Sequence, residues 1–202
     1  MTPLGKILNS ESHLLYHVRV YDATECAEPP EPSDYAFGRF VLLDNPSPEG
    51  TNNPVVGVVA NSRLLNPEAG QYGPRLTIPH SDNAVFAPDY LNEVGVLVSI
   101  LLLGRLTPKG GDHSIPTQVM PVGAEVRTMG NEELQRFHQT PDQRFQMRYY
   151  PIVLESRLPF ASGLLQQICA QLEPHCKPEE LRMLRVLQKN LAWQSTVGQM
   201  RN

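Results

Sequence analysis

Over its first two thirds the chain alternates short apolar stretches with connections rich in proline, glycine and asparagine. Residues 13–22, HLLYHVRVYD, alternate apolar and polar positions with a period of two, which predicts a half-buried strand. Residues 37–45 and 54–65 are two apolar runs that flank a turn-forming stretch, so they predict a hairpin. Residues 85–106 form the most apolar part of the chain, and their β-branched content favours a strand over a helix.

Two shorter extended elements complete the first part of the chain. Residues 75–78, RLTI, predict a short strand inside a long irregular connection, and residues 119–129, VMPVGAEVRTM, predict another extended element. Short strands joined by proline-rich turns are typical of a small antiparallel β-barrel. We therefore expect a closed barrel over residues 1–128.

From residue 129 onward the pattern becomes helical. Residues 130–141 start with Asn131 as the expected N-cap, followed by two glutamates that the helix dipole favours in the first turn. Residues 159–174 and 177–194 repeat leucine and isoleucine at helical spacing. The sequence thus predicts a mainly β protein with α, in which a helical C-terminal extension at residues 129–202 follows the barrel.

Glycines lie within or at the edges of the expected strands, at Gly38, Gly57, Gly95 and Gly104. Glycine lets a strand coil sharply, which a narrow closed sheet requires at its corners. Four such positions therefore favour a strongly curved barrel. The alternative for Gly57 is that its missing side chain admits a ligand backbone.

Composition and charge limit the partners and the cellular location that we expect. A formal net charge of −4 and a pI near 5.9 provide no overall field that would attract nucleic acid or an anionic membrane. Three cysteines at unrelated spacings imply no disulfide framework and fit a reducing cytoplasm. No stretch approaches the roughly 18 apolar residues of a membrane span, so we expect a cytoplasmic protein without a membrane partner.

Three short motifs resemble the HAS-barrel, the small N-terminal β-barrel of HerA-type hexameric DNA-translocating ATPases. They are a GxxV strand at Gly38 to Val41, a VxGxV strand at Val55 to Val59, and a PxGxxV segment at Pro121 to Val126. A short acidic helix at Asn131 to Phe137 follows the last motif, as it does in that family. The resemblance covers residues 13–138 and implies a small barrel with a role in assembly.

The chain departs from that family because it has no phosphate-binding loop of the form GxxxxGK[ST]. A barrel without the ATPase core resembles an assembly or adaptor module. The expected partner is therefore a HerA-type ATPase or another copy of the chain. We expect no catalytic activity and no cofactor.

No motif for nucleophilic or metal chemistry is present either. His13 and His17 would lie on the same face of a strand, too far apart to hold one ion directly. His175 and Cys176 have no partner set, and Cys26 lies among glutamates that would keep its thiol protonated. An enzyme with a small-molecule substrate remains an alternative class, to be tested by a deep pocket with convergent polar groups.

Basic and aromatic residues in or beside the strand connections support a second hypothesis. Arg63, Tyr72, Arg75, His80 and Arg105 are the candidate contacts for a partner or for nucleic acid. Aromatic rings stack on bases and arginines bind phosphates, so single-stranded nucleic-acid binding is the alternative function.

The last predicted helix carries a leucine stripe at Leu181, Leu184, Leu187 and Leu191. A stripe of this kind docks into a partner's groove or pairs across a homodimer. Equally, it packs on the barrel or on the neighbouring helix of the same chain. The sequence alone does not decide between these readings.

Overall fold

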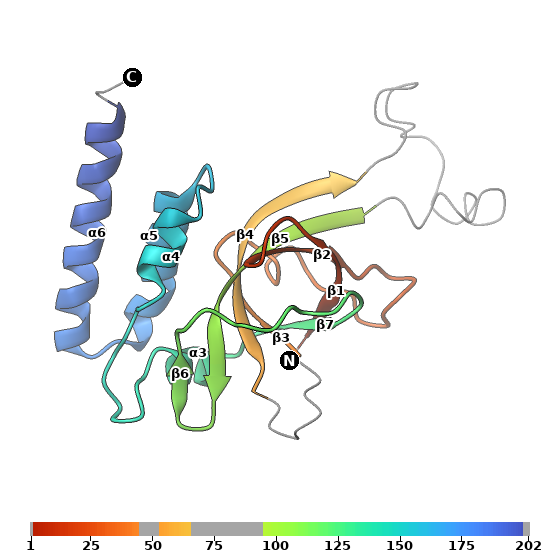
Figure 1. Ribbon diagram of the computed structural model, residues 1–202, viewed down its shortest axis with the longest axis horizontal. Coiled ribbons are helices and arrows are strands. Elements are labelled where there is room, and N and C mark those ends of the chain that lie inside the picture. The colour runs from red at the N-terminus through yellow and green to blue at the C-terminus, as the bar shows by residue number, and fades with distance from the viewer. Residues whose placement is uncertain (1, 45–52, 66–94, 200–202) are drawn as a thin grey trace.

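The computed structural model describes residues 2–44, 53–65 and 95–199, with side chains up to residue 193, and contains a closed barrel followed by helices (Figure 1). Around the barrel the strand order is β2, β1, β7, β3, β4, β5, and β5 pairs with β2 to close it. All six pairings are antiparallel, which confirms the predicted fold class. The strands are β1 (Pro3–Ser10), β2 (Leu15–Val20), β3 (Phe40–Leu43), β4 (Val55–Leu65), β5 (Gly95–Thr107) and β7 (Glu125–Thr128), and β6 (Gly110–Asp112) extends the sheet beyond β5.

Side chains fill the inside of the barrel. Tyr16, Val18 and Val20 point inward from β2, which explains the period of two in that strand. Val98 and Ile100 join them from β5, and all five side chains are at most 5% exposed. The inward-facing cluster is continuous, so the barrel is closed around a packed apolar core.

The outer face of β3, β4 and β5 carries a second apolar cluster, which the helices cover. Phe40 and Leu42 on β3, Val58 on β4 and Leu103 on β5 belong to this cluster. These strands are therefore buried on both faces, which explains why their sequences are continuous apolar runs. The helices are α3 (Asn131–Phe137), α4 (Tyr150–Glu155), α5 (Ala161–Leu172), the 3-10 turn η1 (Glu173–His175) and α6 (Pro178–Gln199).

The barrel and the helices share this outer cluster as one core. β7 ends at Thr128 and α3 begins at Asn131. The division into a barrel at residues 1–128 and an extension at residues 129–202 stays a prediction about folding units. The shared core means that the helices are packed directly on the strands.

Gly57 and Gly104 lie at a shift of register between β4 and β5. A Cβ atom on Gly57 would lie 2.4 Å from Cγ2 of Ile100, and one on Gly104 would lie 2.1 Å from the carbonyl oxygen of Asp112. Both glycines therefore allow close packing within the protein at a bulge, where the strands bend. Gly38 occupies a turn before β3 with φ of 85°, and Gly95 begins β5.

Some sequence predictions were wrong in detail. Residues 119–124 are not a strand, because only Glu125–Thr128 pair in the sheet. Gly130, not Asn131, is the N-cap of α3, and its N–H is capped by the Glu133 carboxylate at 3.0 Å. The expected strand at residues 75–78 lies outside the described residues.

Three elements were not predicted at all. β1 is essential to closure because it joins β2 to β7, yet its sequence PLGKILNS has too many polar residues to show a strand pattern. β6 is only three residues long, and two of them are glycines. The helix α4 spans six residues and starts with Tyr150 and Pro151.

Candidate functional site

A buried aromatic and histidine cluster anchors the segment between α3 and α4. His138 Nδ1 donates a hydrogen bond to the carbonyl of Leu134 at 2.8 Å, and its Nε2 lies 2.6 Å from the Tyr149 hydroxyl. The Phe137 and Tyr149 rings are stacked with centroids 5.9 Å apart. His138 and Tyr149 are at most 2% exposed, so the two ends of the segment are held rigidly in the core.

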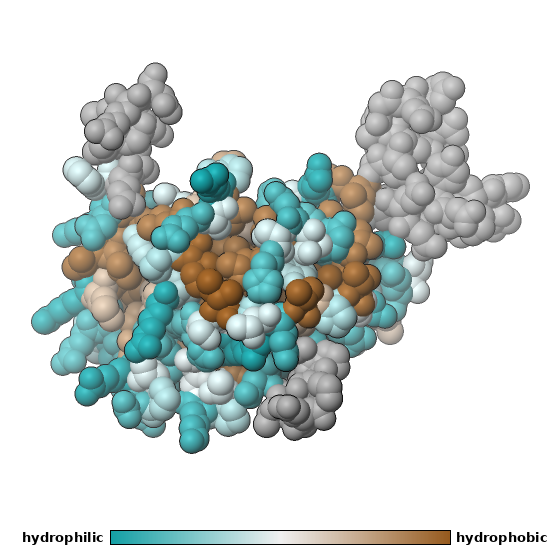
Figure 2. Space-filling model, viewed as in Figure 1, coloured by the Kyte–Doolittle hydropathy of each residue, from teal (hydrophilic) through white to brown (hydrophobic). Residues whose placement is uncertain are grey.

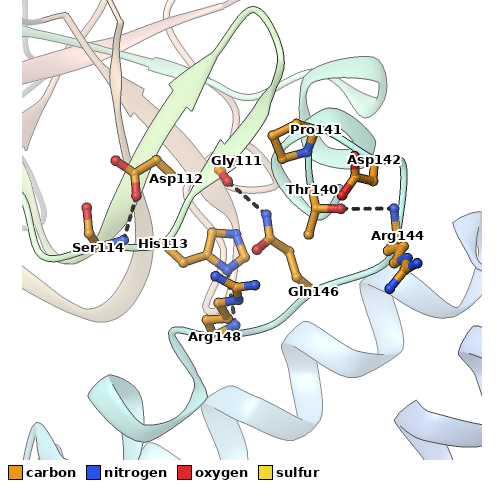
Figure 3. Close-up of a pocket in the computed structure, with 10 residues that line it drawn as sticks. All are labelled: Gly111, Asp112, His113, Ser114, Thr140, Pro141, Asp142, Arg144, Gln146 and Arg148. Carbon is orange, nitrogen blue, oxygen red and sulfur yellow. Dashed lines mark hydrogen bonds between the residues drawn. The ribbon is translucent and has the colours of Figure 1, made fainter.

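Side-chain hydrogen bonds tie the same segment to β6. Gln146 donates to the carbonyls of Gly111 and Gln139, at 2.8 and 3.0 Å. His113 Nε2 donates to the carbonyl of Phe137 at 2.9 Å, and its Nδ1 accepts the backbone N–H of Arg148 at 3.1 Å. Figure 3 shows Gln146 reaching toward Gly111 and His113 lying beside Arg148.

Burial keeps both histidines neutral. The pKa of His113 is lowered to about 4, chiefly by desolvation and also by the nearby Arg148 guanidinium, while the hydrogen bond to the Phe137 carbonyl opposes the shift. Desolvation likewise lowers the pKa of His138 to about 3. Each neutral imidazole donates from one nitrogen and accepts at the other, so both rings have structural partners on each side.

The anchored segment forms one wall of an open groove of about 610 Å³. We call it the arginine groove. It is formed by Met183 and Leu187 of α6 and, from the connection after α3 and the start of α4, by Thr140, Arg144, Phe145, Gln146, Met147, Arg148, Tyr150 and Pro151. Phe145 and Tyr150 supply half-buried aromatic surface within it. A second hollow of about 480 Å³ adjoins the groove and is the one drawn in Figure 3.

The charged residues that line the arginine groove, among those described, are all positive. Arg144 and Arg148 are exposed, and in the part of the chain that the structure describes neither guanidinium forms an ion pair or a hydrogen bond. No carboxylate is among the described residues that line the groove, although the chain as a whole carries a net charge of −4. Two cations without a partner among the described residues thus lie beside apolar and aromatic surface.

A third hollow, of about 850 Å³, lies between the barrel and the connection from α4 to α5. Figure 2 shows apolar surface in the middle of the molecule, between the side of α6 and the side of the β4–β5 ladder. His13 Nε2 contacts the Pro116 carbonyl at 2.6 Å at the rim, and His17 Nδ1 contacts the Ser99 hydroxyl at 3.1 Å. The two histidines have separate partners, and no group able to hold a metal ion occurs among the described residues.

The structure separates Arg63 from Arg105, the two described residues among those proposed for nucleic acid. Arg63 is exposed on β4 opposite Leu97, whereas Arg105 lies opposite Val55 at the other end of the β4–β5 ladder. Nε and Nη2 of Arg105 are buried and form no hydrogen bond with the described residues, so they do not face solvent. Tyr72, Arg75 and His80 lie outside the described residues.

The leucine stripe of α6 faces its own chain. Leu184 and Leu191 are fully buried in the cluster shared with α5, and Leu181 and Leu187 are partly buried. Packing on the neighbouring helix is thus the arrangement in the structure. Leu187 also lines the arginine groove, as does Met183, which is 46% exposed.

Sequence reasoning missed Arg144 and Arg148, which the structure brings to one groove. Their segment, DQRFQMRYYP, interleaves arginines with aromatic residues, and this was the available signal. The segment has neither a helical nor a strand period, so no face was assigned to the two arginines.

Together the closed barrel and its helical layer define a small β-barrel protein with helices packed on one side of the sheet. The chain belongs to the family described as a domain of unknown function (DUF8166), whose family model matches residues 1–201. Among curated proteins, none matches the chain.

Proposed function

We propose that this protein is a non-catalytic assembly or adaptor module that binds a protein partner through the arginine groove. The observation that carries the proposal is a pair of guanidinium groups, Arg144 and Arg148, that have no ion pair or hydrogen bond among the described residues and lie beside apolar and aromatic side chains. Arginine and aromatic residues are enriched in protein interfaces, where burial strengthens their contacts.

The polar groups of the interior support a role without catalysis. His113 and His138 each have hydrogen-bonding partners at both ring nitrogens, as described above. Burial raises the pKa of the Cys169 thiol to about 11, so it stays protonated and is a poor nucleophile at neutral pH. Each of these groups is better suited to holding the fold than to reacting with a substrate.

The resemblance to the HAS-barrel supports a HerA-type ATPase as the partner, with another copy of the chain as the second choice. The closed barrel is the fold that this resemblance implies. No cofactor is needed for such a role. The three free cysteines support a location in the reducing cytoplasm. Of the described residues, no helix has the length and apolar character needed to cross a membrane.

The test is co-expression with a HerA-type ATPase, followed by affinity capture and measurement of mass in solution. We expect capture of the ATPase by the wild-type chain and its loss when Arg144→Glu and Arg148→Glu are combined. The double variant Arg63→Glu with Arg157→Glu is the matched control, because it changes the charge equally at exposed arginines outside the groove.

Two results would count against the proposal. Absence of any complex, with either the ATPase or a second copy, would remove the assembly role. Salt-sensitive retention of single-stranded DNA that is lost in the Arg63 control variant would instead favour the nucleic-acid function.

A further inference from the structure

The connection after β2 carries acidic residues and no basic residue over residues 25–34. Residues 25–34, ECAEPPEPSD, form no helix or strand. Glu28 and Glu31 are exposed, and their carboxylates have no ion pair or hydrogen bond in the described residues. The segment therefore carries two carboxylates that have no partner among the described residues and that another surface can bind.

Prolines restrict the shape of this segment. Glu28 and Glu31 each precede a proline, which disfavours helical backbone and favours an extended or polyproline conformation. Residues 29–31, between a bend at 27–28 and a turn at 32–35, belong to no helix, strand, turn or bend. In a polyproline II conformation, side chains three residues apart lie on the same side, about 9 Å apart along the axis. A restricted segment loses less entropy on binding than a flexible one.

We propose that the arginine groove of one copy binds the acidic proline segment, residues 25–34, of a second copy. Glu28 and Glu31 meet the guanidinium groups of the groove, and the exposed Pro29 between them lies on its aromatic surface. Aromatic grooves are a known way of binding proline-rich segments, and arginine and carboxylate form strong paired hydrogen bonds.

The contact is between copies because the segment does not line the groove of its own chain. In Figure 1 the connection after β2 leaves the barrel on the side away from α6. Groove and segment are different surfaces, so the interface is head-to-tail and builds a ring or an open chain of copies. This inference rests on the proposed function, because it names the partner of the same groove.

A charge-swap experiment tests the inference with the full chain. The wild type is expected to reach at least twice the 22.6 kDa of one chain at low salt, and to dissociate as salt screens the contact. The groove variant, R144E with R148E, and the segment variant, E28R with E31R, are each expected to be monomeric. The control variant, R63E with R157E, is expected to keep the wild-type mass.

Mixing the two monomeric variants is the decisive step. The acidic segment of the groove variant then meets an intact arginine groove, and the arginine segment of the other variant meets a glutamate groove. We expect the mixture to recover the wild-type mass, while neither variant does so alone. A variant that merely misfolds would not recover, and circular dichroism of each variant reports its fold separately.

The outcomes separate the two proposals. A wild type that is monomeric at low salt and high concentration, or variants that keep its mass, overturn the inference. If the groove variant nevertheless loses the HerA-type ATPase, the proposed function stands and another protein occupies the groove. If the groove variant changes neither mass nor capture, both proposals fail.

Discussion

His138 Nε2 and the Tyr149 hydroxyl lie 2.6 Å apart in the apolar core that the helices share with the barrel. Nδ1 of the same ring carries the proton and donates a hydrogen bond to the Leu134 carbonyl. Nε2 therefore accepts a hydrogen bond from the Tyr149 hydroxyl. This pair joins the end of α3 to the start of α4 and so positions the segment that carries the arginine groove.

Tyr149→Phe is expected to lower the free energy of unfolding by about 1–3 kcal/mol. The substitution keeps the ring but leaves His138 Nε2 buried without a donor. Chemical denaturation measures the change. Tyr150→Phe is the matched control, because Tyr150 is only partly buried and forms no hydroxyl hydrogen bond in the described residues, and it is expected to change stability by less than about 0.5 kcal/mol. Equal effects of the two substitutions would contradict the importance of the pair.

The free energy of unfolding is expected to fall as the pH is lowered from about 6.5 toward 4. Unfolded histidines take up protons near pH 6.5, whereas burial lowers the folded pKa of His113 to about 4 and of His138 to about 3. The unfolded state therefore binds more protons in this range, at about 1.4 kcal/mol per pH unit for each histidine. Denaturation at pH 7 and pH 5 measures the loss, and equal stabilities at the two values would show that the histidines are not held neutral.

Glu133→Gln is expected to destabilise the protein by about 1–3 kcal/mol. The Glu133 carboxylate accepts hydrogen bonds from Arg127 at 3.0 and 3.2 Å and from the Gly130 N–H. Burial raises the pKa of Glu133, but these bonds outweigh it and hold the pKa below its usual range. The control Glu132→Gln removes an exposed charge from the same helical turn. Thermal unfolding of both variants checks the difference, and a control as unstable as Glu133→Gln would refute it.

Gly111→Ala is expected to destabilise the protein by about 2 kcal/mol or more. A Cβ atom there would lie 1.8 Å from the Phe137 carbonyl oxygen, so β6 and the end of α3 would have to separate. Gly163→Ala in α5 meets nothing within 4 Å and is expected to stabilise the helix by up to about 1 kcal/mol. Opposite signs in denaturation support this packing, and two neutral substitutions would contradict it.

Much of the fold was predictable because the burial of one or both faces of a strand produces a recognisable pattern of apolar residues in its sequence. The alternation in β2 and the two-faced apolar runs in β3, β4 and β5 follow from which faces are covered. Gly57 could be interpreted as a point where the strand bends, because it interrupts an apolar run that otherwise predicts a strand. β1 was not predictable, since Lys6, Asn9 and Ser10 interrupt its pattern and its pairing with β2 and β7 supplies its stability.

The candidate site was largely unpredictable. Arg144 and Arg148 lie in a segment without a repeating pattern. Their position depends on hydrogen bonds that Gln146 and the Arg148 N–H donate to Gly111 and His113, which are far away in the chain. The leucine stripe was visible, but its partner was not. Only the structure shows Leu184 and Leu191 against the neighbouring helix, leaving Met183 at the groove.

By itself the sequence determined a small barrel of short strands, a helical end and the lack of a phosphate loop, because local periodicity, glycine placement and motif spacing are properties of neighbouring residues. Only the tertiary structure decided which strands close the barrel and which charges gather in one groove. Those outcomes depend on contacts between residues distant in the chain, and such contacts leave no repeating pattern along it.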